Sequence, residues 1–430
     1  MAWRNTPASK RGKVLYEAAK IIESQHEEFA RTLTEEEGKT LAESRGEVRR
    51  AIDIFLFYSS LGRLIKGDTF QSDSERTFLY SVREPLGVVA LLTPWNFPIA
   101  IPSWKIAPAL ISGNTVVFKP SSLAPLIAQK LVSALEKAGL PPGVLNYITG
   151  PGGSVGNELA NNNDVDAISF TGSYEVGNGI QKARHDSKKM IRVQLEMGGK
   201  NPIIVLQDAR LDEAVKLVIA SAFGLTGQAC TATSRVIIDE RVKEEFVEKL
   251  VNQVSSLVIG DGLDPKTQMG PAVSKQEMEK DLGYIEIGRK EGAEVIFGGN
   301  QIMDSTHSHG YFIQPTIFDA VTSDMKIARE EIFGPVLSIM NARNKEDAIE
   351  LANNSEYGLT AGLCTTDLSN ALEFVDKIQA GVIKINKPTT GLELHVPFGG
   401  FKKSSSNTFK EQGEAAIDFY TRVKTVYVGY

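Results

Sequence analysis

The pattern of apolar and polar positions along this chain changes at about residue 87. Before it, residues 13–30 place apolar side chains on one face, which predicts an amphipathic helix, and a mostly polar helical region follows. After it come short apolar runs rich in β-branched residues, at 87–92, 115–119, 144–150, 166–172 and 201–206. Helical stretches such as 126–138 separate several of these runs. Short apolar strands that alternate with helices indicate a parallel sheet covered on both faces.

A second alternation of strands and helices occupies the later part of the chain. It begins with an apolar run at 234–240, continues with a helical stretch near 241–257 and includes later strands such as 381–386. This predicts a second α/β domain after about residue 200. Segments 77–87 and 424–430 alternate like strands but fit neither series. Outlying β segments of this kind often pair with each other or extend a sheet across a subunit boundary.

The composition is that of an ordinary globular protein, and it narrows the choice of partners. The net charge is −6 and basic residues form no run, which argues against a nucleic acid or an anionic membrane as partner. The two cysteines, Cys230 and Cys364, cannot form a disulfide framework, so we expect a reducing compartment. The sequence has no stretch like a signal peptide or a membrane span, so we expect a cytoplasmic protein. Five scattered histidines and no close cysteine pair argue against a zinc or iron site.

Cys230 and Glu196 are the candidate reactive pair. Cys230 follows a Gly-Gln turn after an apolar helical stretch, and Glu196 stands shortly before Gly198–Gly199. An activated thiol can attack a carbonyl carbon, and a flexible glycine turn would let the carboxylate reach a water molecule. Taken singly, the cysteine could instead be a small buried apolar residue and the glutamate a helix cap or a surface residue.

Turns between the predicted strands and helices are candidate phosphate and ribose sites. Gly150, Gly152 and Gly156 are spaced one residue wider than the dinucleotide fingerprint, and its acidic residue is missing, so a plain turn is the alternative. The segment 170–173 could offer backbone N–H groups to a pyrophosphate. Lys119 and Ser122 stand at the carboxyl end of a strand, which faces the ligand crevice in a doubly wound sheet. A solvated surface lysine is the alternative there.

Several motifs in one order give the chain a resemblance to the NAD(P)-dependent aldehyde dehydrogenase superfamily. They are TPWNFP (93–98), VFKPSS (117–122), FTGS (170–173), Glu196, Cys230, EEIFGPV (330–336) and the late signature PFGGFKKSS (397–405). The resemblance runs from about residue 3 to the C-terminus. It implies an α/β protein with two doubly wound parallel-sheet domains, one Rossmann-like for the cofactor and one catalytic, plus a small β oligomerisation element. The implied parts are an NAD(P)-binding domain of residues 1–66 and 86–198, a catalytic domain of residues 199–402, and an oligomerisation element of residues 67–85 and 403–430.

The resemblance also implies roles for single residues. Cys230 resembles the nucleophile, Glu196 the general base and Asn96 the side-chain donor of the oxyanion hole. Glu331 resembles the carboxylate on the nicotinamide ribose, and Phe333 the ring that packs beside the nicotinamide. The remaining expected cofactor-binding residues are Trp95, Lys119, Ser122, Gly152, Gly156, Phe170, Gly172 and Ser173. No metal is expected.

The implied reaction oxidises an aldehyde to a carboxylic acid. Thiolate attack and hydride transfer would leave a thioester, which a water molecule activated by Glu196 would hydrolyse. Members that favour NAD commonly carry a glutamate where this chain has Ser122, so we expect NADP to be preferred over NAD. The chain also begins several dozen residues later than typical members, without the N-terminal strands that pack on their cofactor domain. The resemblance to the family therefore does not by itself imply that this chain is an active enzyme.

Two segments near the C-terminus narrow the choice of substrate. Residues 389–406 and 410–421 look most like those of dehydrogenases of 2,5-dioxopentanoate, whose product is 2-oxoglutarate. Succinate semialdehyde or a broad range of aldehydes are the alternatives. A cofactor-independent thiol esterase and an inactive structural homologue also stay open. The outlying β segments lead us to expect a homodimer or a homotetramer.

Overall fold

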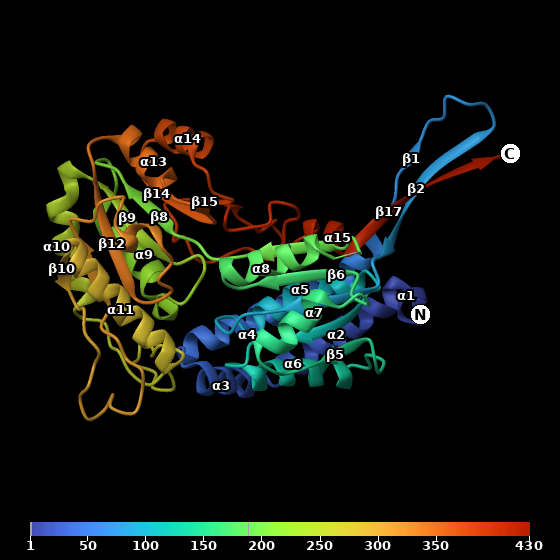
Figure 1. The fold of residues 1–430 in the computed structure, drawn as a ribbon, viewed down its shortest axis with the longest axis horizontal. Coiled ribbons are helices and arrows are strands. Elements are labelled where there is room, and N and C mark those ends of the chain that lie inside the picture. Colours follow the sequence, from blue (N-terminus) through green and yellow to red (C-terminus); the bar gives the residue numbers. More distant parts are fainter. Residues whose placement is uncertain (1, 188) are drawn as a thin grey trace.

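The computed structural model describes residues 2–187 and 189–430, which form two parallel sheets covered by helices and an antiparallel arm (Figure 1). The α/β fold expected from the sequence, with two parallel sheets and a small separate β element, is confirmed. Among the helices of these described residues, none combines the length and the apolar composition needed to cross a membrane.

The first sheet runs in the order β5-β4-β3-β6-β7, and all its strands are parallel. Its strands are β3 (Val88–Leu92), β4 (Thr115–Lys119), β5 (Leu145–Tyr147), β6 (Ala167–Thr171) and β7 (Arg192–Glu196). Alternate residues of β3 point to opposite faces, so Val89 and Leu91 pack into one layer and Ala90 and Leu92 into the other. The apolar runs of the sequence predict every strand of this sheet except β7.

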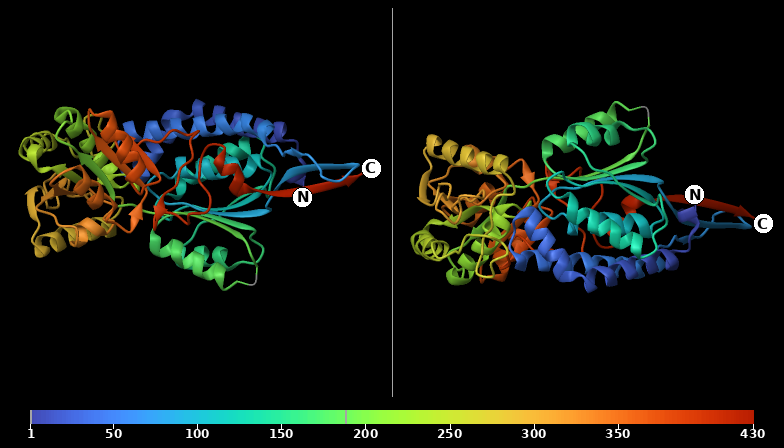
Figure 2. Two further views of the ribbon diagram at one scale, coloured as in Figure 1. Left: turned by 90° about the horizontal axis from the view of Figure 1, so that it is seen from above. Right: turned by 90° about the horizontal axis from the view of Figure 1, so that it is seen from below.

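Helices α5 and α6 cover one face of the first sheet, α1 to α4 pack on the outside of these two helices, and α7 and α8 cover the other face (Figure 2). Their bounds are α1 (Ala2–Asn5), α2 (Ala8–Ser24), α3 (His26–Glu37), α4 (Leu41–Leu61), α5 (Ala100–Ile111), α6 (Pro125–Lys137), α7 (Asn157–Asn161) and α8 (Tyr174–His185). The prediction of a single helix over residues 13–30 is wrong, because the helix breaks at Gln25. Glu27 and Glu28 in the first turn of α3 favour a new helix start there, since acidic side chains stabilise a helix N-terminus.

The second sheet runs in the order β10-β11-β12-β9-β8-β14-β15, and only the edge pair β10–β11 is antiparallel among these described strands. Its strands are β8 (Asn201–Val205), β9 (Thr233–Asp239), β10 (Glu294–Phe297), β11 (Thr316–Asp319), β12 (Val336–Ala342), β14 (Thr360–Cys364) and β15 (Val382–Ile385). One face carries α9 (Leu211–Ala222) and α10 (Lys243–Val254), and the other carries α11 (Lys275–Glu291), α13 (Lys345–Asn353) and α14 (Leu368–Lys377). The run 201–206, grouped with the earlier strands in the sequence pattern, is β8 of this second sheet.

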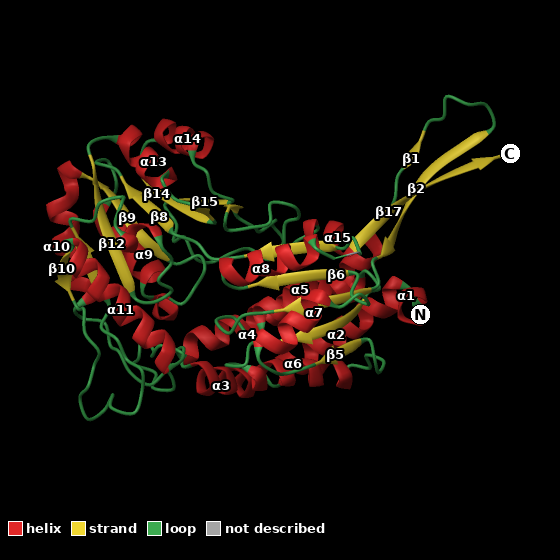
Figure 3. Ribbon diagram, in the orientation of Figure 1, coloured by secondary structure: helices red, strands yellow, loops and turns green. Residues whose placement is uncertain are grey.

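The two outlying β segments pair with each other, as the sequence pattern predicts. The strands of this arm are β1 (Thr69–Phe70), β2 (Thr77–Pro85) and β17 (Thr421–Gly429). β17 runs antiparallel to β2 along its whole length, and β1 pairs with the other edge of β2. The arm consists of strands and loops and extends away from both sheets (Figure 3). Phe78 and Tyr427 on the arm are exposed.

Candidate active site

β3 and β6 are neighbours in the first sheet, and the chain leaves them toward opposite edges. A parallel sheet forms a ligand crevice at such a point, outside the carboxyl ends of its strands. Trp95 and Asn96 follow β3, and Gly172 and Ser173 follow β6. All four residues line one cavity of about 930 Å³.

The opposite wall of this cavity comes from the amino ends of strands in the second sheet. Gly198 precedes β8, Cys230 precedes β9, and Glu331 and Phe333 precede β12. These residues line the same cavity. The carboxyl ends of the first sheet therefore face the amino ends of the second across the space in which a ligand would bind.

The structure brings together only part of the site expected from the sequence. The expected residues that line the cavity are Trp95, Asn96, Gly172, Ser173, Cys230, Glu331 and Phe333. The expected residues outside its lining are Glu196, Lys119, Ser122, Gly152, Gly156 and Phe170.

A tight turn after α9 carries Cys230 to the cavity. Leu225, Thr226 and Gly227 all adopt left-handed backbone conformations, with φ angles of 54°, 57° and 70°. A Cβ atom at position 227 would lie 2.2 Å from the carbonyl oxygen of Gly334, so only glycine fits there. The turn thus reverses the chain between α9 and β9 and leaves Cys230 at its end.

Two side-chain amides fix the backbone around Cys230. Asn96 Nδ2 donates to the carbonyl oxygen of Gln228 at 3.0 Å, and Asn201 Nδ2 donates to that of Cys230 at 2.7 Å. Burial raises the pKa of the Cys230 thiol to about 12, and nearby carboxylates, Glu331 first among them, add to the rise. In this arrangement the thiol is protonated at neutral pH.

Glu196 ends β7, and its carboxyl group is enclosed by the segment 399–405 rather than open to the cavity. Its Oε1 accepts from Ser405 Oγ at 3.0 Å, and its Oε2 accepts from the Gly400 N–H at 3.2 Å. Burial and then the negative charge of Glu411 raise the pKa of Glu196 well above its ordinary value. The sequence singles out the segment 397–405 but gives its residues no part in holding Glu196.

A buried charged cluster adjoins Glu196. Lys105 Nζ donates to Ser169 Oγ at 2.7 Å and to the carboxylate of Glu411. Trp104 Nε1 donates to the other oxygen of Glu411 at 2.8 Å. Sequence reasoning missed this cluster. The signal that could have found it is Lys105 itself, a charged residue that interrupts the apolar run of α5.

Glu331 fills the space beside the Gly198–Gly199 turn. Its Oε1 accepts from the Gly199 N–H at 3.0 Å, and a Cβ atom at Gly198 would lie 1.8 Å from its Oε2. Burial raises the pKa of Glu331 to about 7. The glycine turn that the sequence connects with Glu196 thus makes room for another carboxylate. Next to it, the rings of Trp95 and Phe333 pack edge to face with centroids 5.4 Å apart.

Helix α8 begins at the cavity. Ser173 caps it, since its Oγ accepts from the Val176 N–H at 3.4 Å. Residues 172–175 line the cavity, so the first N–H groups of the helix lie along its wall. A Cβ atom at Gly172 would lie 2.4 Å from the ring of Phe170, which places Phe170 directly beneath this turn.

The remaining expected residues gather beyond the carboxyl ends of β4 and β5. Lys119 Nζ donates to the carbonyl oxygen of Pro120 at 2.9 Å. Ser122 Oγ donates to the carbonyl oxygen of Gly150 at 3.1 Å, which ties the end of β4 to the glycine-rich segment. Gly156 packs against Leu92 and Gly152 borders open space.

Comparisons with known proteins show which family the chain resembles over nearly its whole length. The profile of the Aldehyde dehydrogenase family matches residues 1–426. The chain is 49% identical over 428 residues to 2,5-dioxopentanoate dehydrogenase of Saccharolobus solfataricus, covering 100% of this chain and 88% of the relative. It is 46% identical over 427 residues to alpha-ketoglutaric semialdehyde dehydrogenase of Bacillus subtilis, covering 99% of this chain and 87% of the relative. A crystal structure of betaine aldehyde dehydrogenase from Staphylococcus aureus in complex with NAD+ superposes with a TM-score of 0.96 at 33% identity, covering 99% of this chain and 84% of that one.

Proposed function

The chain belongs to the aldehyde dehydrogenase family, and we propose that it oxidises 2,5-dioxopentanoate to 2-oxoglutarate with a nicotinamide dinucleotide. One observation carries the reaction: Cys230 opens, beside Asn96, into the cavity that Glu331 and Phe333 also line. The substrate rests on the relatives, since those named for this semialdehyde are 46–49% identical to the chain, against 38% for betaine aldehyde dehydrogenase of Bacillus subtilis.

Cys230 is the proposed nucleophile. The thiol first loses its proton to water; the sulfur then bonds to the aldehyde carbon, the carbon–oxygen π bond breaks, and the carbonyl oxygen becomes an oxyanion. An amide NH2 group has two hydrogens, so Asn96 Nδ2 can donate one to Gln228 and the other to the oxyanion. The Cys230 N–H would be the second donor. Losing one such donor costs about 10²–10³-fold in kcat in a comparable enzyme.

The residues along the cavity fit a dinucleotide. The start of α8 offers N–H groups to a pyrophosphate, and no Cβ at Gly172 obstructs an approach to them. Glu331 would accept from a ribose hydroxyl, and Phe333 with Trp95 would form the apolar wall for a ring. When bound, the dinucleotide supplies the acceptor for the hydride that leaves the substrate carbon.

Glu196 is the proposed base for hydrolysis of the thioester. Its carboxyl must leave Ser405 and Gly400, lose its proton and reach a water molecule near Cys230. The raised pKa supports this role, because a base works best when its pKa lies close to the operating pH. The water adds to the thioester carbon, the carbon–sulfur bond breaks, and Cys230 is released.

Ser122 is the proposed determinant of cofactor choice. Its side chain is exposed and hydrogen-bonds to Gly150. Because serine is uncharged, it would not repel the 2′-phosphate of NADP, as a carboxylate at this position would. We therefore expect a preference for NADP. Ser122→Glu should shift the ratio of kcat/KM values toward NAD by roughly tenfold or more, whereas Ser121→Glu, one residue away, should shift it much less. An unchanged ratio in Ser122→Glu would remove Ser122 from this role.

We propose a division of the chain into three parts. We assign residues 1–66 and 86–198 to the dinucleotide-binding domain, residues 199–402 to the catalytic domain, and residues 67–85 and 403–430 to oligomerisation. The exposed Phe78 and Tyr427 on the arm support the last part, because isolated strands with exposed aromatic side chains favour contact with another chain. Light scattering should give a homodimer or homotetramer.

The experiment that tests the function follows absorbance of reduced nicotinamide with NAD and NADP in turn. The aldehydes are 2,5-dioxopentanoate, succinate semialdehyde and an uncharged aldehyde of similar length. We expect the highest kcat/KM for 2,5-dioxopentanoate and no turnover by Cys230→Ala. A higher value for succinate semialdehyde would change the substrate but keep the reaction. Ester hydrolysis without any aldehyde oxidation would instead support a thiol esterase.

A further inference from the structure

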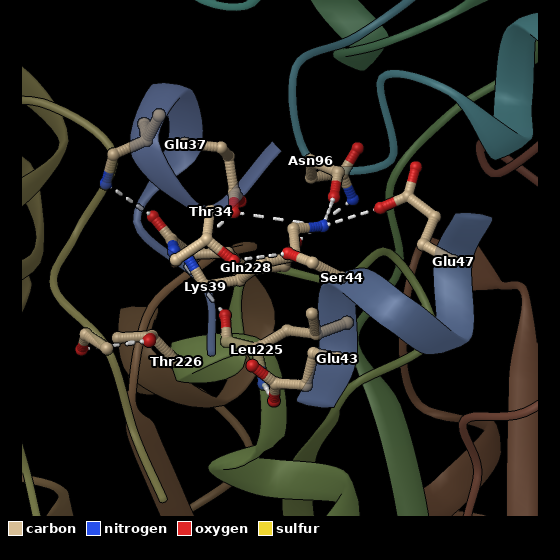
Figure 4. A network of polar contacts seen from close by, with 12 residues as sticks. Thr34, Glu37, Lys39, Glu43, Ser44, Glu47, Asn96, Leu225, Thr226 and Gln228 are labelled. Carbon is tan, nitrogen blue, oxygen red and sulfur yellow. Dashed lines mark hydrogen bonds and ion pairs between the residues drawn. The ribbon is translucent and has the colours of Figure 1, made fainter. Parts of the chain in front are cut away.

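Lys39, in the link between α3 and α4, is a fully buried cation that reaches the backbone of Asn96 (Figure 4). Its Nζ donates to the carbonyl oxygen of Asn96 at 2.5 Å and to Glu47 Oε2 at 2.8 Å. Glu37 Oε2 lies 3.7 Å from the same nitrogen. The sequence shows only a lysine after Gly38, with nothing to connect it to residue 96.

Glu47 extends this contact to the residues after Asn96. Its Oε1 accepts from the N–H groups of both Ile99 and Ala100 at 3.0 Å. These N–H groups stand at the start of α5, where the helix itself supplies no acceptor for them. The ring of Phe97 lies 4.8 Å from Lys39 Nζ. The backbone from residue 96 to residue 100 is therefore held by a cation at its first carbonyl group and by an anion at its last N–H groups.

Glu43, one helical turn before Glu47, holds the other side of the site. Its Oε1 accepts from the Leu225 N–H at 2.7 Å, within the left-handed turn that leads to Cys230. Asn96 Nδ2 then bridges the two segments through Gln228 (Figure 4). One turn of α4 thus contacts both the segment that carries the proposed oxyanion donor and the segment that carries the proposed nucleophile.

None of Lys39, Glu43 and Glu47 lines the cavity, so they do not touch a substrate within the described structure. Burial of a lysine with two glutamates is a poor way to gain stability, because apolar residues of similar volume often stabilise a core as well or better. Such a cluster does fix geometry, since each charged group needs its partners in place.

We propose that Lys39, with Glu47 and Glu43, forms a positioning clamp that sets the Asn96 amide at its working distance from Cys230. The clamp rests on the proposed function, in which Asn96 stabilises the oxyanion. Lys39 and Glu47 act through Asn96: without the Asn96 side chain, the backbone that they hold at residue 96 carries no amide donor for the oxyanion. Glu43 holds the turn before Cys230 instead.

A double-mutant cycle tests this. Lys39→Met should lower kcat/KM for the aldehyde by about 10²-fold, the effect expected when a catalytic group is displaced by about 1 Å. Asn96→Ala should lower it by about 10²–10³-fold. In the Asn96→Ala background, Lys39→Met should cost less than about threefold more, because the two changes remove the same interaction. Full multiplication of the two losses would overturn the clamp.

Alkylation of Cys230 by iodoacetamide separates positioning from general damage. This substitution forms no oxyanion, so its rate at fixed pH should stay within about twofold of wild type in Lys39→Met. Arg11→Met is the matched control, since Arg11 is also a buried cation bound to backbone carbonyls, those of Ile111 and Thr6, in the same helical layer. It should lower thermal stability while leaving kcat/KM unchanged. Equal losses of alkylation and oxidation in Lys39→Met would refute the proposal.

The remaining outcomes are also decisive. If Lys39→Met does not fold, Glu47→Gln enters the same cycle with Asn96→Ala, and the two losses must be non-additive. If the wild-type enzyme oxidises no aldehyde, the proposed function fails. If it oxidises aldehydes and the losses multiply, only the clamp fails.

Discussion

Replacing Asp281 with asparagine should remove a large pH dependence from the stability of this protein. Asp281 lies on α11, its side chain is fully buried, and neither carboxyl oxygen has a hydrogen-bond partner in residues 2–187 and 189–430. The carboxyl lies against Gly334, where a Cβ atom would come within 2.0 Å of Oδ2. Burial raises the pKa of Asp281 from 3.8 to about 8.

The direction in which the free energy of unfolding changes with pH follows from proton binding at Asp281. Between pH 3.8 and about 8 the native state holds a proton at Asp281 that the unfolded chain releases. The free energy of unfolding therefore falls as pH rises through this window and levels off above it. At about 1.4 kcal/mol per pKa unit, the total loss is at most roughly 6 kcal/mol. Asparagine has the same shape and no charge, so this loss should vanish in Asp281→Asn.

Urea unfolding at pH 5, 7 and 9 measures the effect. At pH 5 the variant should be more stable than wild type by less than about 2 kcal/mol, because only the first part of the window between 3.8 and about 8 has been passed, and at pH 9 it should be more stable by several kcal/mol. Asp212→Asn is the control, since Asp212 is an exposed carboxylate paired with Lys249, and its removal should change stability little at any of these pH values. Stability curves of wild type and Asp281→Asn that stay parallel from pH 5 to 9 would refute the reasoning.

Four further predictions concern the site. Glu196→Gln should keep the first burst of reduced nicotinamide but slow steady turnover by about 10²–10⁴-fold, and rapid mixing that finds no burst would contradict the assigned role. Wild-type turnover should rise with pH above the range in which an ordinary carboxyl ionises, because burial raises the pKa of Glu196 and the carboxyl must ionise, and a flat profile would be inconsistent with this. Gly227→Ala should lower the melting temperature and abolish oxidation, since its Cβ would meet Gly334; an unaffected variant in calorimetry would show that the turn can relax. Gly198→Ala should raise KM for the dinucleotide by displacing Glu331, which a cofactor titration would check.

The strands that could be predicted from the sequence are those buried on both faces. A run such as 88–92 is apolar at every position because helices cover both sides of it. Strand β7 is not a continuous apolar run, so the same pattern could not predict it. Its Gln194 bonds to Ser169 and to the carbonyl oxygen of Lys410, and its Arg192 bonds to carbonyl groups of residues 418–421. Polar side chains whose partners lie on other segments, most of them more than two hundred residues away, give no local signal of burial.

The same limit explains which parts of the site could be predicted. Cys230 and Asn96 stand in short motifs, and the structure brings both to one cavity. Glu411 and Lys39 have no such motif, and the motif that contains Ser405 does not show that it holds Glu196. Each is buried only because a distant segment supplies its partner: Lys105 for Glu411, Glu196 for Ser405 and Glu47 for Lys39. Pairings of this kind become visible only in three dimensions.

The charge state of the cavity argues for an ordered use of its two reactive groups. The pKa of Cys230 is raised by burial and then by the carboxylates of Glu331 and Glu196, so ionisation of any one of these groups opposes ionisation of the others. A thiolate beside an ionised Glu196 would be costly. The carboxyl of Glu196 is protonated most readily where the structure holds it, enclosed by Gly400 and Ser405. We therefore expect Glu196 to stay enclosed during attack and to ionise only after Cys230 has become a neutral thioester.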